Sequence, residues 1–169
     1  MTRAPFRIEL LDQHDRTEFD CGVPPLNDYL QSRASQDLRR RISMCYVAIE
    51  NDTDMLAGYY TLSATGIAMT DLPDKTTKRL PRYPTVPAVL VGRLAVDVDF
   101  QGRRLGGALL IDALKRTDDA GIAAFAMIVD AKDDDAVAFY EHFGFKRFED
   151  LEQKLFLPIG DGLKRLLQK

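Results

Sequence analysis

Residues 90–110 read LVGRLAVDVDFQGRRLGGALL, and no other stretch of the chain is as informative about its architecture. Apolar and β-branched residues dominate Ala88–Phe100, where we expect one long buried strand. Gln101–Gly107 supplies the glycines of a turn, and Ala108–Asp119 has the apolar repeat of a helix with one buried side. The segment therefore predicts a strand that passes through a glycine turn into a helix.

A turn of this kind exposes unpaired backbone N–H groups at the positive end of the helix dipole, and that combination binds phosphate. Arg103 and Arg104 can add side-chain charge to it. The residues match neither the Gly-Lys-Ser/Thr of a nucleotide P-loop nor the G-x-G-x-x-G of a dinucleotide turn. A glycine pair before a helix is more often only a tight turn, so an anion site and a plain turn both stay open here.

The residues before this segment predict three strands and one helix. The strands are expected at Phe6–Leu10, Met44–Ile49 and Leu56–Leu62. The last two flank the turn-rich Asn51–Asp54, which suits an antiparallel hairpin, and Pro24-Pro25 begins a helix that ends near Arg41. Residues 70–88 hold four prolines and four basic residues, which predicts a long connection of the kind that often carries function.

The residues after the segment predict two more strands and a second helix. Ala124–Val129 and Lys154–Ile159 have the composition of strands, and Asp133–His142 is expected to form a helix that ends at Gly144. The three aspartates that open this helix complement its dipole, which favours a helix start over a metal site. We therefore predict no metal.

The composition is that of a globular protein of 169 residues and 19.0 kDa, which predicts one domain over residues 1–169. No apolar run approaches the ~20 residues that span a bilayer, so we expect a cytoplasmic protein. Cys21 and Cys45 have no metal-like spacing and are interpreted as buried hydrophobes. The net charge of −3 argues against general affinity for nucleic acids, although a local basic patch can still steer one.

Residues 136–145 read AVAFYEHFGF and place Tyr140 on the helix that ends at Gly144. Together with the glycine turn they resemble the GNAT acetyltransferase family, in which a strand, a Q/R-x-x-G-x-G/A turn and a helix hold the pyrophosphate of acetyl-CoA. A later helix of that family carries an F-Y-x-x-x-G-F signature. The resemblance implies acetyl-CoA as cosubstrate and Tyr140 as general acid. The residues that it assigns to cofactor binding are Leu94, Ala95, Val96, Gly102, Arg103, Arg104, Leu105, Gly106 and Gly107.

Two N-terminal motifs, Phe19-Asp20-Cys21-Gly22 and Leu26-Asn27-x-Tyr29-Leu30, are similar to those of the acetyltransferase toxins of bacterial toxin–antitoxin modules. The resemblance covers nearly the whole chain. It implies that the acceptor is the α-amino group of an aminoacyl-tRNA, whose acetylation blocks translation. It also implies neutralisation by a ribbon-helix-helix antitoxin, repression of the operon through operator DNA, and a homodimer.

The fold implied is α/β of the GNAT type: a mixed, mainly antiparallel sheet of six or seven strands, splayed beside Leu90–Val98, with helices on both faces. Two residues depart from the family pattern. Arg104 stands where a glycine is usual, so the pyrophosphate would be cradled without the flexibility of that residue. Asp133 stands where many relatives have an asparagine, and a carboxylate cannot donate the same hydrogen bond.

Acetyl transfer needs a neutral amine, a stabilised oxyanion and a proton for the leaving thiolate. An α-amino group titrates near ~7.7–8.0, so no strong base is needed. A tyrosine hydroxyl can donate at neutral pH, although Tyr140 among phenylalanines can also be a core residue. Backbone N–H groups around Leu94–Val96 would stabilise the oxyanion. We interpret His142 as structural or exposed and His14 as solvated.

Basic residues at three places are candidates for contacts with tRNA. The candidates are Arg39, Arg40, Lys75, Lys78, Arg79 and Arg93. The alternative for the arginines near Arg41 is a solvated helix end that complements the dipole. Two other functions also stay open: an acetyltransferase of a protein or small amine, and a non-catalytic acyl-CoA-binding regulator.

Overall fold

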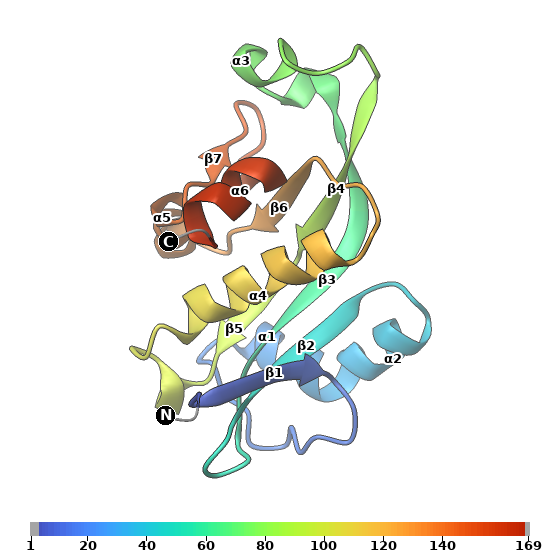
Figure 1. Ribbon diagram of the computed structural model, residues 1–169. Coiled ribbons are helices and arrows are strands. Elements are labelled where there is room, and N and C mark those ends of the chain that lie inside the picture. The colour runs from blue at the N-terminus through green and yellow to red at the C-terminus, as the bar shows by residue number, and fades with distance from the viewer. Residues whose placement is uncertain (1–3, 168–169) are drawn as a thin grey trace. The chain divides into compact units, whose positions relative to one another are not determined.

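The computed structural model describes residues 4–167, which divide into two compact units (Figure 1). The first unit comprises residues 4–63 and 93–112, and the second comprises residues 64–92 and 113–167. Each unit is described by itself. No helix within the described residues is long and apolar enough to cross a membrane.

The first unit contains an antiparallel sheet built largely as expected. Strand β1 (Phe6–Leu10) pairs with β2 (Met44–Glu50), and β2 pairs with the first half of β3 (Leu56–Ala68). The short strand β5 (Leu94–Val96) pairs with β3 on its other side. The predicted hairpin at Asn51–Asp54 is confirmed, and Asp54 takes a left-handed backbone conformation with φ 58° in its turn.

The helix predicted from Pro24 is present but interrupted by a wider turn. It consists of α1 (Pro24–Asp28), a π-helical turn η1 (Tyr29–Arg33) and α2 (Ala34–Arg39). The π turn accompanies the burial of two consecutive side chains, Tyr29 and Leu30, which a regular helix would point in different directions. Arg41, with φ 60°, ends the helix where we expected it to end.

The second unit contains a mixed sheet. The parallel pair is β4 (Thr85–Val91) with β6 (Ala126–Asp130), and β8 (Lys154–Pro158) runs antiparallel to both β6 and β7 (Lys146–Arg147). Its sheet order is β3–β4–β6–β8–β7. The helices of this unit and its connection are α3 (Asp74–Thr77), α5 (Asp134–His142) and α6 (Ile159–Leu166), with a 3₁₀ turn η2 at Met69–Asp71.

The mixed α/β fold is confirmed, but one predicted strand is wrong. Ala88–Phe100 is not continuous: β4 ends at Val91, β5 begins at Leu94, and a 3₁₀ turn η3 (Val98–Phe100) follows. At the break, the backbone of Arg93 is bonded to Thr61, and the turn after β5 is formed at Asp97, which is buried and uses its carboxylate oxygens to accept from the backbone N–H groups of Asp20 (3.0 Å) and Asp99 (2.9 Å). A buried carboxylate needs such partners, so the chain turns where it finds them.

The division of this strand also changes the strand count. Within residues 4–167 the sheet has eight strands instead of the predicted six or seven, because Ala88–Phe100 supplies two and the short β7 was not foreseen. The helix after the glycine turn, α4 (Leu105–Asp119), begins three residues earlier than predicted.

Each unit has its own apolar cluster. The cluster of the first unit includes Leu30, Val47 and Tyr59, and both cysteines lie in it as free, buried thiols, as expected. Burial raises the pKa of the Cys45 thiol to about 12. The cluster of the second unit is built around Phe156, which packs on Phe148 with ring centroids 4.9 Å apart.

Candidate functional site

The glycine turn of the first unit has two left-handed residues. Gly102 has φ 82° and Arg104 has φ 61°. Leu105, Gly106 and Gly107 form the first turn of α4, so their N–H groups precede the first helical hydrogen bond, which runs from the N–H of Ala108 to the carbonyl of Arg104 at 3.2 Å. The turn therefore presents successive N–H groups at the positive end of a fifteen-residue helix, which suits a phosphate group.

The two arginines of this turn have different surroundings. Arg103 forms an ion pair with Glu50 at 2.8 Å, and its guanidinium lies 5.1 Å from the centroid of the Phe100 ring. Hydrogen bonds from Thr53, and then Arg103, lower the pKa of Glu50. Arg104 has the left-handed backbone conformation that glycine adopts readily. Its departure from the family pattern therefore changes the side chain at this position more than the backbone conformation of the turn.

Strand β5 holds the three residues expected to meet the acetyl group. Leu94, Ala95 and Val96 pair with Tyr60, Tyr59 and Gly58 of β3. A Cβ atom on Gly58 would lie 2.9 Å from the carbonyl oxygen of Ala95, so this close approach requires a glycine. Within the first unit β3 is the strand that pairs with β5, and the backbone groups on the opposite edge of β5 are not used by that pairing.

Arg93 lies in the break before β5 and is fixed at both ends. Its backbone N–H donates to Thr61 Oγ1 (3.1 Å), and its carbonyl accepts from the N–H of Thr61 (3.0 Å). Its guanidinium carbon lies 3.6 Å from the centroid of the Tyr29 ring. Tyr29 donates its hydroxyl to Asp37 (2.7 Å), and burial together with this bond raises its pKa to about 12.

A cavity of about 520 Å³ opens beside this stack. We call it the Arg93 cavity, and its lining residues are Pro25, Leu26, Asp28, Tyr29, Ser32, Arg33 and Arg93. Sequence reasoning identified Arg93 but not Tyr29, whose only signal was its place in the Leu26–Leu30 motif. The stack depends on residues far apart in the chain, which no local pattern reports.

Tyr140 lies on α5 of the second unit, with 5% of its surface exposed. Its ring contacts those of Phe139 and Phe145, with centroids 5.2 and 5.5 Å away. Burial, and then the charge of Asp130, raises the pKa of its hydroxyl, so the group is protonated at neutral pH. This environment suits a proton donor and also suits a core tyrosine.

The two ends of α5 are built as the sequence indicated. Asp133 is the N-cap and accepts from the N–H of Ala136 at 2.9 Å, which confirms the aspartates as a helix start. Gly144, with φ 97°, ends the helix, and Arg165 of α6 packs against it and donates to the carbonyl of His142 (3.5 Å). Tyr140 therefore lies one turn from a firmly defined helix end.

The two histidines differ in exposure, since His142 is exposed and His14 is half-buried. His142 is exposed at the end of α5, in agreement with its interpretation. His14 is not simply solvated, which corrects the prediction: its Nε2 lies 2.8 Å from Glu9 Oε1, and its Nδ1 accepts from the N–H of Asp12 at 3.0 Å. These bonds hold the polar turn after β1. No cluster of three or more possible metal ligands occurs among the described residues.

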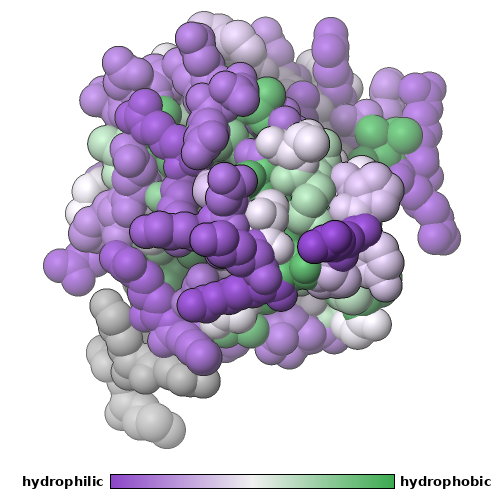
Figure 2. Space-filling model, turned by 90° about the horizontal axis from the view of Figure 1, so that it is seen from above, coloured by the Kyte–Doolittle hydropathy of each residue, from purple (hydrophilic) through white to green (hydrophobic). Residues whose placement is uncertain are grey.

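The basic candidates fall into separate groups. Arg39 and Arg40 are exposed at the end of α2 in the first unit. Lys75, Lys78 and Arg79 are exposed on and after α3 in the second. Hydrophilic side chains cover much of the face of the molecule seen in Figure 2.

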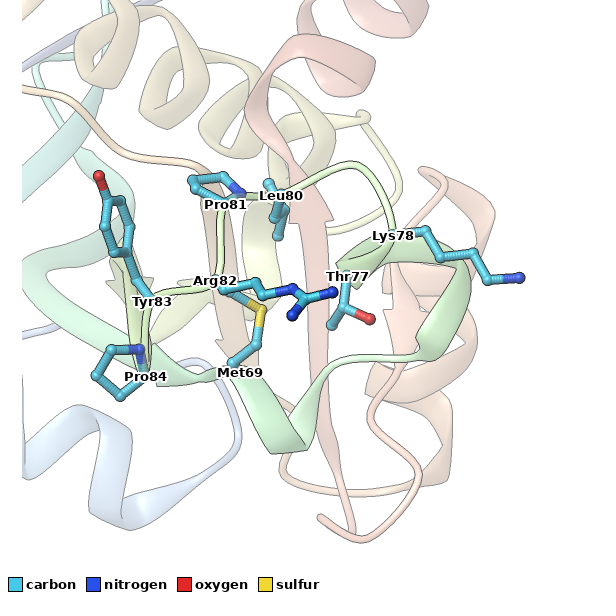
Figure 3. A pocket seen from close by; sticks show the side chains of 8 residues that line it. All are labelled: Met69, Thr77, Lys78, Leu80, Pro81, Arg82, Tyr83 and Pro84. Atoms are coloured by element: carbon cyan, nitrogen blue, oxygen red, sulfur yellow. The ribbon is translucent and has the colours of Figure 1, made fainter.

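The proline-rich connection of the second unit forms a second cavity, of about 510 Å³ (Figure 3). Its lining residues are Met69, Thr77, Lys78, Leu80, Pro81, Arg82, Tyr83 and Pro84. Figure 3 shows the Arg82 side chain directed towards Thr77, with Tyr83 and Lys78 at opposite ends. The long connection therefore lines this cavity with both apolar and cationic side chains.

Comparison with known proteins identifies the family. The model of the acetyltransferase (GNAT) domain matches residues 82–156. Over 145 residues the chain is 39% identical to a tRNA-acetylating toxin of Mycobacterium tuberculosis (strain ATCC 25618 / H37Rv), and the match covers 85% of this chain and 84% of that protein.

Two solved structures of AtaT are similar over almost their whole length. AtaT complexed with acetyl-methionyl-tRNAfMet has a TM-score of 0.85 at 29% identity, with 97% of this chain and 99% of that chain covered. A tyrosine-to-phenylalanine mutant of AtaT, bound to the C-terminus of the antitoxin AtaR and acetyl-CoA, has a TM-score of 0.79 at 25% identity, with 95% and 98% covered. From its motifs, its fold and these likenesses, the chain belongs to the GNAT acetyltransferase family, in the subgroup of toxin–antitoxin acetyltransferase toxins.

Proposed function

We propose that this protein is a toxin that transfers acetyl from acetyl-CoA to the α-amino group of an aminoacyl-tRNA and so blocks translation. The observation that carries the proposal is the 39% identity to a tRNA-acetylating toxin over 85% of the chain. The glycine turn at Gly102–Leu105 and the buried Tyr140 support it, because each suits one requirement of acetyl transfer.

The reaction joins the amine nitrogen to the acetyl carbon and breaks the bond from that carbon to the CoA sulfur. The neutral amine attacks, a backbone N–H of Leu94, Ala95 or Val96 stabilises the oxyanion, and the thiolate leaves as the carbonyl re-forms. Tyr140 gives the thiolate its proton, and the proton lost by the amine returns to solvent. Because an α-amino group titrates near ~7.7–8.0 and an ester lowers this further, the reaction needs no strong base.

The cofactor would be held mainly by backbone groups. The N–H groups of Leu105, Gly106 and Gly107 serve the pyrophosphate, with Gly102 and Arg104 shaping the turn. Arg103 would have to share its charge with Glu50. The acetyl-CoA bound in the AtaT structure supports this choice of cosubstrate.

The proposed tRNA surface consists of Arg39, Arg40, Lys75, Lys78, Arg79 and Arg93. If these residues contact phosphates, acetylation of charged tRNA weakens steeply as salt rises. Removing Lys78 or Arg39 would then reduce the slope of that dependence by about one per phosphate contact. A response to salt that is the same in both variants as in the native protein would exclude these two residues.

The remaining partners follow from the family. We propose a ribbon-helix-helix antitoxin that neutralises the toxin, repression of their operon by the pair through operator DNA, and a homodimer. An enzyme that acts on charged tRNA works where translation takes place, so we propose the cytoplasm. We further propose that residues 1–169 act as one acetyltransferase domain that needs no metal.

The test of this function is to incubate the protein with labelled acetyl-CoA and a total pool of charged tRNA. Uncharged tRNA and free amino acids are the controls. Label in the charged pool alone supports the proposal, and sequencing of the labelled tRNAs gives the specificity. Turnover without label in any RNA would reject it in favour of an acetyltransferase of proteins or small amines.

A further inference from the structure

The Arg93 cavity contains two arginines whose hydrogen-bond donors have no acceptor among the described residues. It is lined by two guanidinium groups, those of Arg33 and Arg93, and by one carboxylate, that of Asp28. Neither arginine side chain forms a hydrogen bond or ion pair with any of residues 4–167. Arg33 is exposed, whereas Arg93 is half-buried, and a half-buried guanidinium with unused donors is costly unless a ligand satisfies them, so the cavity is suited to an anion.

Arg93 is also held ready for such a ligand. Its backbone is bonded to Thr61 through both its N–H and its carbonyl, and its guanidinium carbon lies over the Tyr29 ring, 3.6 Å from the centroid. Asp37 accepts the Tyr29 hydroxyl at 2.7 Å and so fixes the ring beneath it. A guanidinium supported in this way keeps its N–H edges free for the two parallel hydrogen bonds that a phosphate accepts.

The position of Arg93 indicates which phosphate group of the substrate the cavity would bind. Arg93 directly precedes β5, the strand proposed to hold the acetyl group and the oxyanion. The acceptor amine must therefore come close to this end of the cavity. In an aminoacyl-tRNA the anion nearest to the esterified ribose is the phosphate of the terminal nucleotide.

We propose that the Arg93 cavity binds the 3′-terminal nucleotide of the acceptor, with its phosphate on Arg93 and Arg33. Tyr29 and Asp37 are positioning residues that hold Arg93 in place. The inference rests on the proposed function and deepens it, because the cavity would distinguish an aminoacylated nucleotide from a free amine.

The experiment compares two minimal acceptors, adenosine that carries an aminoacyl ester at its 3′ oxygen, with and without a 5′-phosphate. For the native protein the phosphate lowers KM about tenfold, the effect of one charge-assisted contact. In Arg93→Gln this advantage disappears, so the KM values of the two acceptors become similar. The control Arg147→Gln, on an exposed arginine paired with Glu141, keeps the full advantage.

Two further variants separate binding from simple structural support. Arg93→Lys keeps the charge but loses the planar fork, so part of the phosphate advantage remains. Tyr29→Phe keeps the ring and removes only the bond to Asp37, so KM for the phosphorylated acceptor rises and KM for the other acceptor does not. A rise in both KM values together would contradict the positioning role.

The results overturn the proposal in either of two ways. A phosphate advantage that persists in Arg93→Gln would place the phosphate elsewhere. A native protein that acetylates charged tRNA but shows no preference for the phosphorylated minimal acceptor would leave the cavity without this ligand. Failure of the native protein to acetylate any of these acceptors, charged tRNA included, would reject the proposed function and this inference together.

Discussion

The turn at Asp97–Leu105 and the end of α5 at Tyr140–Phe145 are proposed to serve the same reaction in different ways. The turn is exposed at Gly102 and Arg104 and presents backbone N–H groups, with two left-handed residues shaping it. At the helix end Tyr140 and Phe145 are buried, and burial raises the pKa of the Tyr140 hydroxyl, so it is protonated at neutral pH. The turn therefore depends on conformation and tolerates changes of side chain, whereas the helix end depends on one atom and on its burial.

The largest effect on activity is expected from removal of the Tyr140 hydroxyl. Tyr140→Phe removes the hydroxyl and keeps the ring among Phe139 and Phe145, so kcat falls at least about 100-fold, as for the loss of a general acid. The free energy of unfolding changes little, because the packing remains. Single-turnover rates at saturating substrates measure this, with Tyr83→Phe as an exposed control that keeps the native rate. A near-native rate in Tyr140→Phe would make Tyr140 a core residue only.

The helix end should also be sensitive to its glycine. Gly144→Ala imposes a left-handed φ of 97° on a residue with a Cβ atom, and that atom would meet the Arg165 side chain at 3.1 Å. The free energy of unfolding falls by about 1–2 kcal/mol or more. The matched control Gly160→Ala, whose Cβ meets nothing within 4 Å, lies on α6 and leaves stability unchanged or slightly raised. Equal effects in thermal denaturation would contradict this reading.

Substitutions of Arg104 should affect stability and acetyl-CoA binding through their backbone preference rather than through the loss of charge. Arg104→Val places a β-branched residue at φ 61°, so stability falls by about 1–2 kcal/mol and KM for acetyl-CoA rises. Arg104→Gly adopts the same conformation without strain, but it also increases the conformational freedom of the unfolded chain. These two effects oppose each other, so the free energy of unfolding changes by no more than about 1 kcal/mol. If Arg104→Gly weakens acetyl-CoA binding as much as Arg104→Val, the side chain and not the shape is what matters.

The smallest effect is expected on the alkaline side of the pH profile. As the proposed proton donor, Tyr140 acts in its protonated form. Burial raises its pKa above the usual ~10, so the alkaline fall in activity is expected at a higher pH. The rate therefore rises as the acceptor amine loses its proton and then stays level up to about pH 10. A decline of kcat between pH 8 and 9 in the native protein would show that the donor is a more acidic group.

The features that could be predicted from the sequence are those with local causes. Both ends of α5 were foreseen, because aspartates open the helix at Asp133 and Gly144 ends it. The hairpin at Asn51–Asp54 was foreseen because turn residues stand between apolar runs. The break before β5 and the turn after it were missed because both involve partners distant in the sequence, Thr61 for the backbone of Arg93 and the N–H of Asp20 for Asp97. The Tyr29–Arg93 stack was missed for the same reason, since only the folded unit brings the two side chains together.

The central claim is that the acetyl group is placed on the α-nitrogen of the amino acid carried by tRNA. It is tested most directly by digesting the reacted tRNA to nucleosides and examining the aminoacyl-adenosine end by mass spectrometry. We expect an N-acetylaminoacyl-adenosine with the native protein and only the unmodified ester with Tyr140→Phe. Acetyl on a base, or an unmodified ester with the native protein while acetyl-CoA is consumed, would contradict the account.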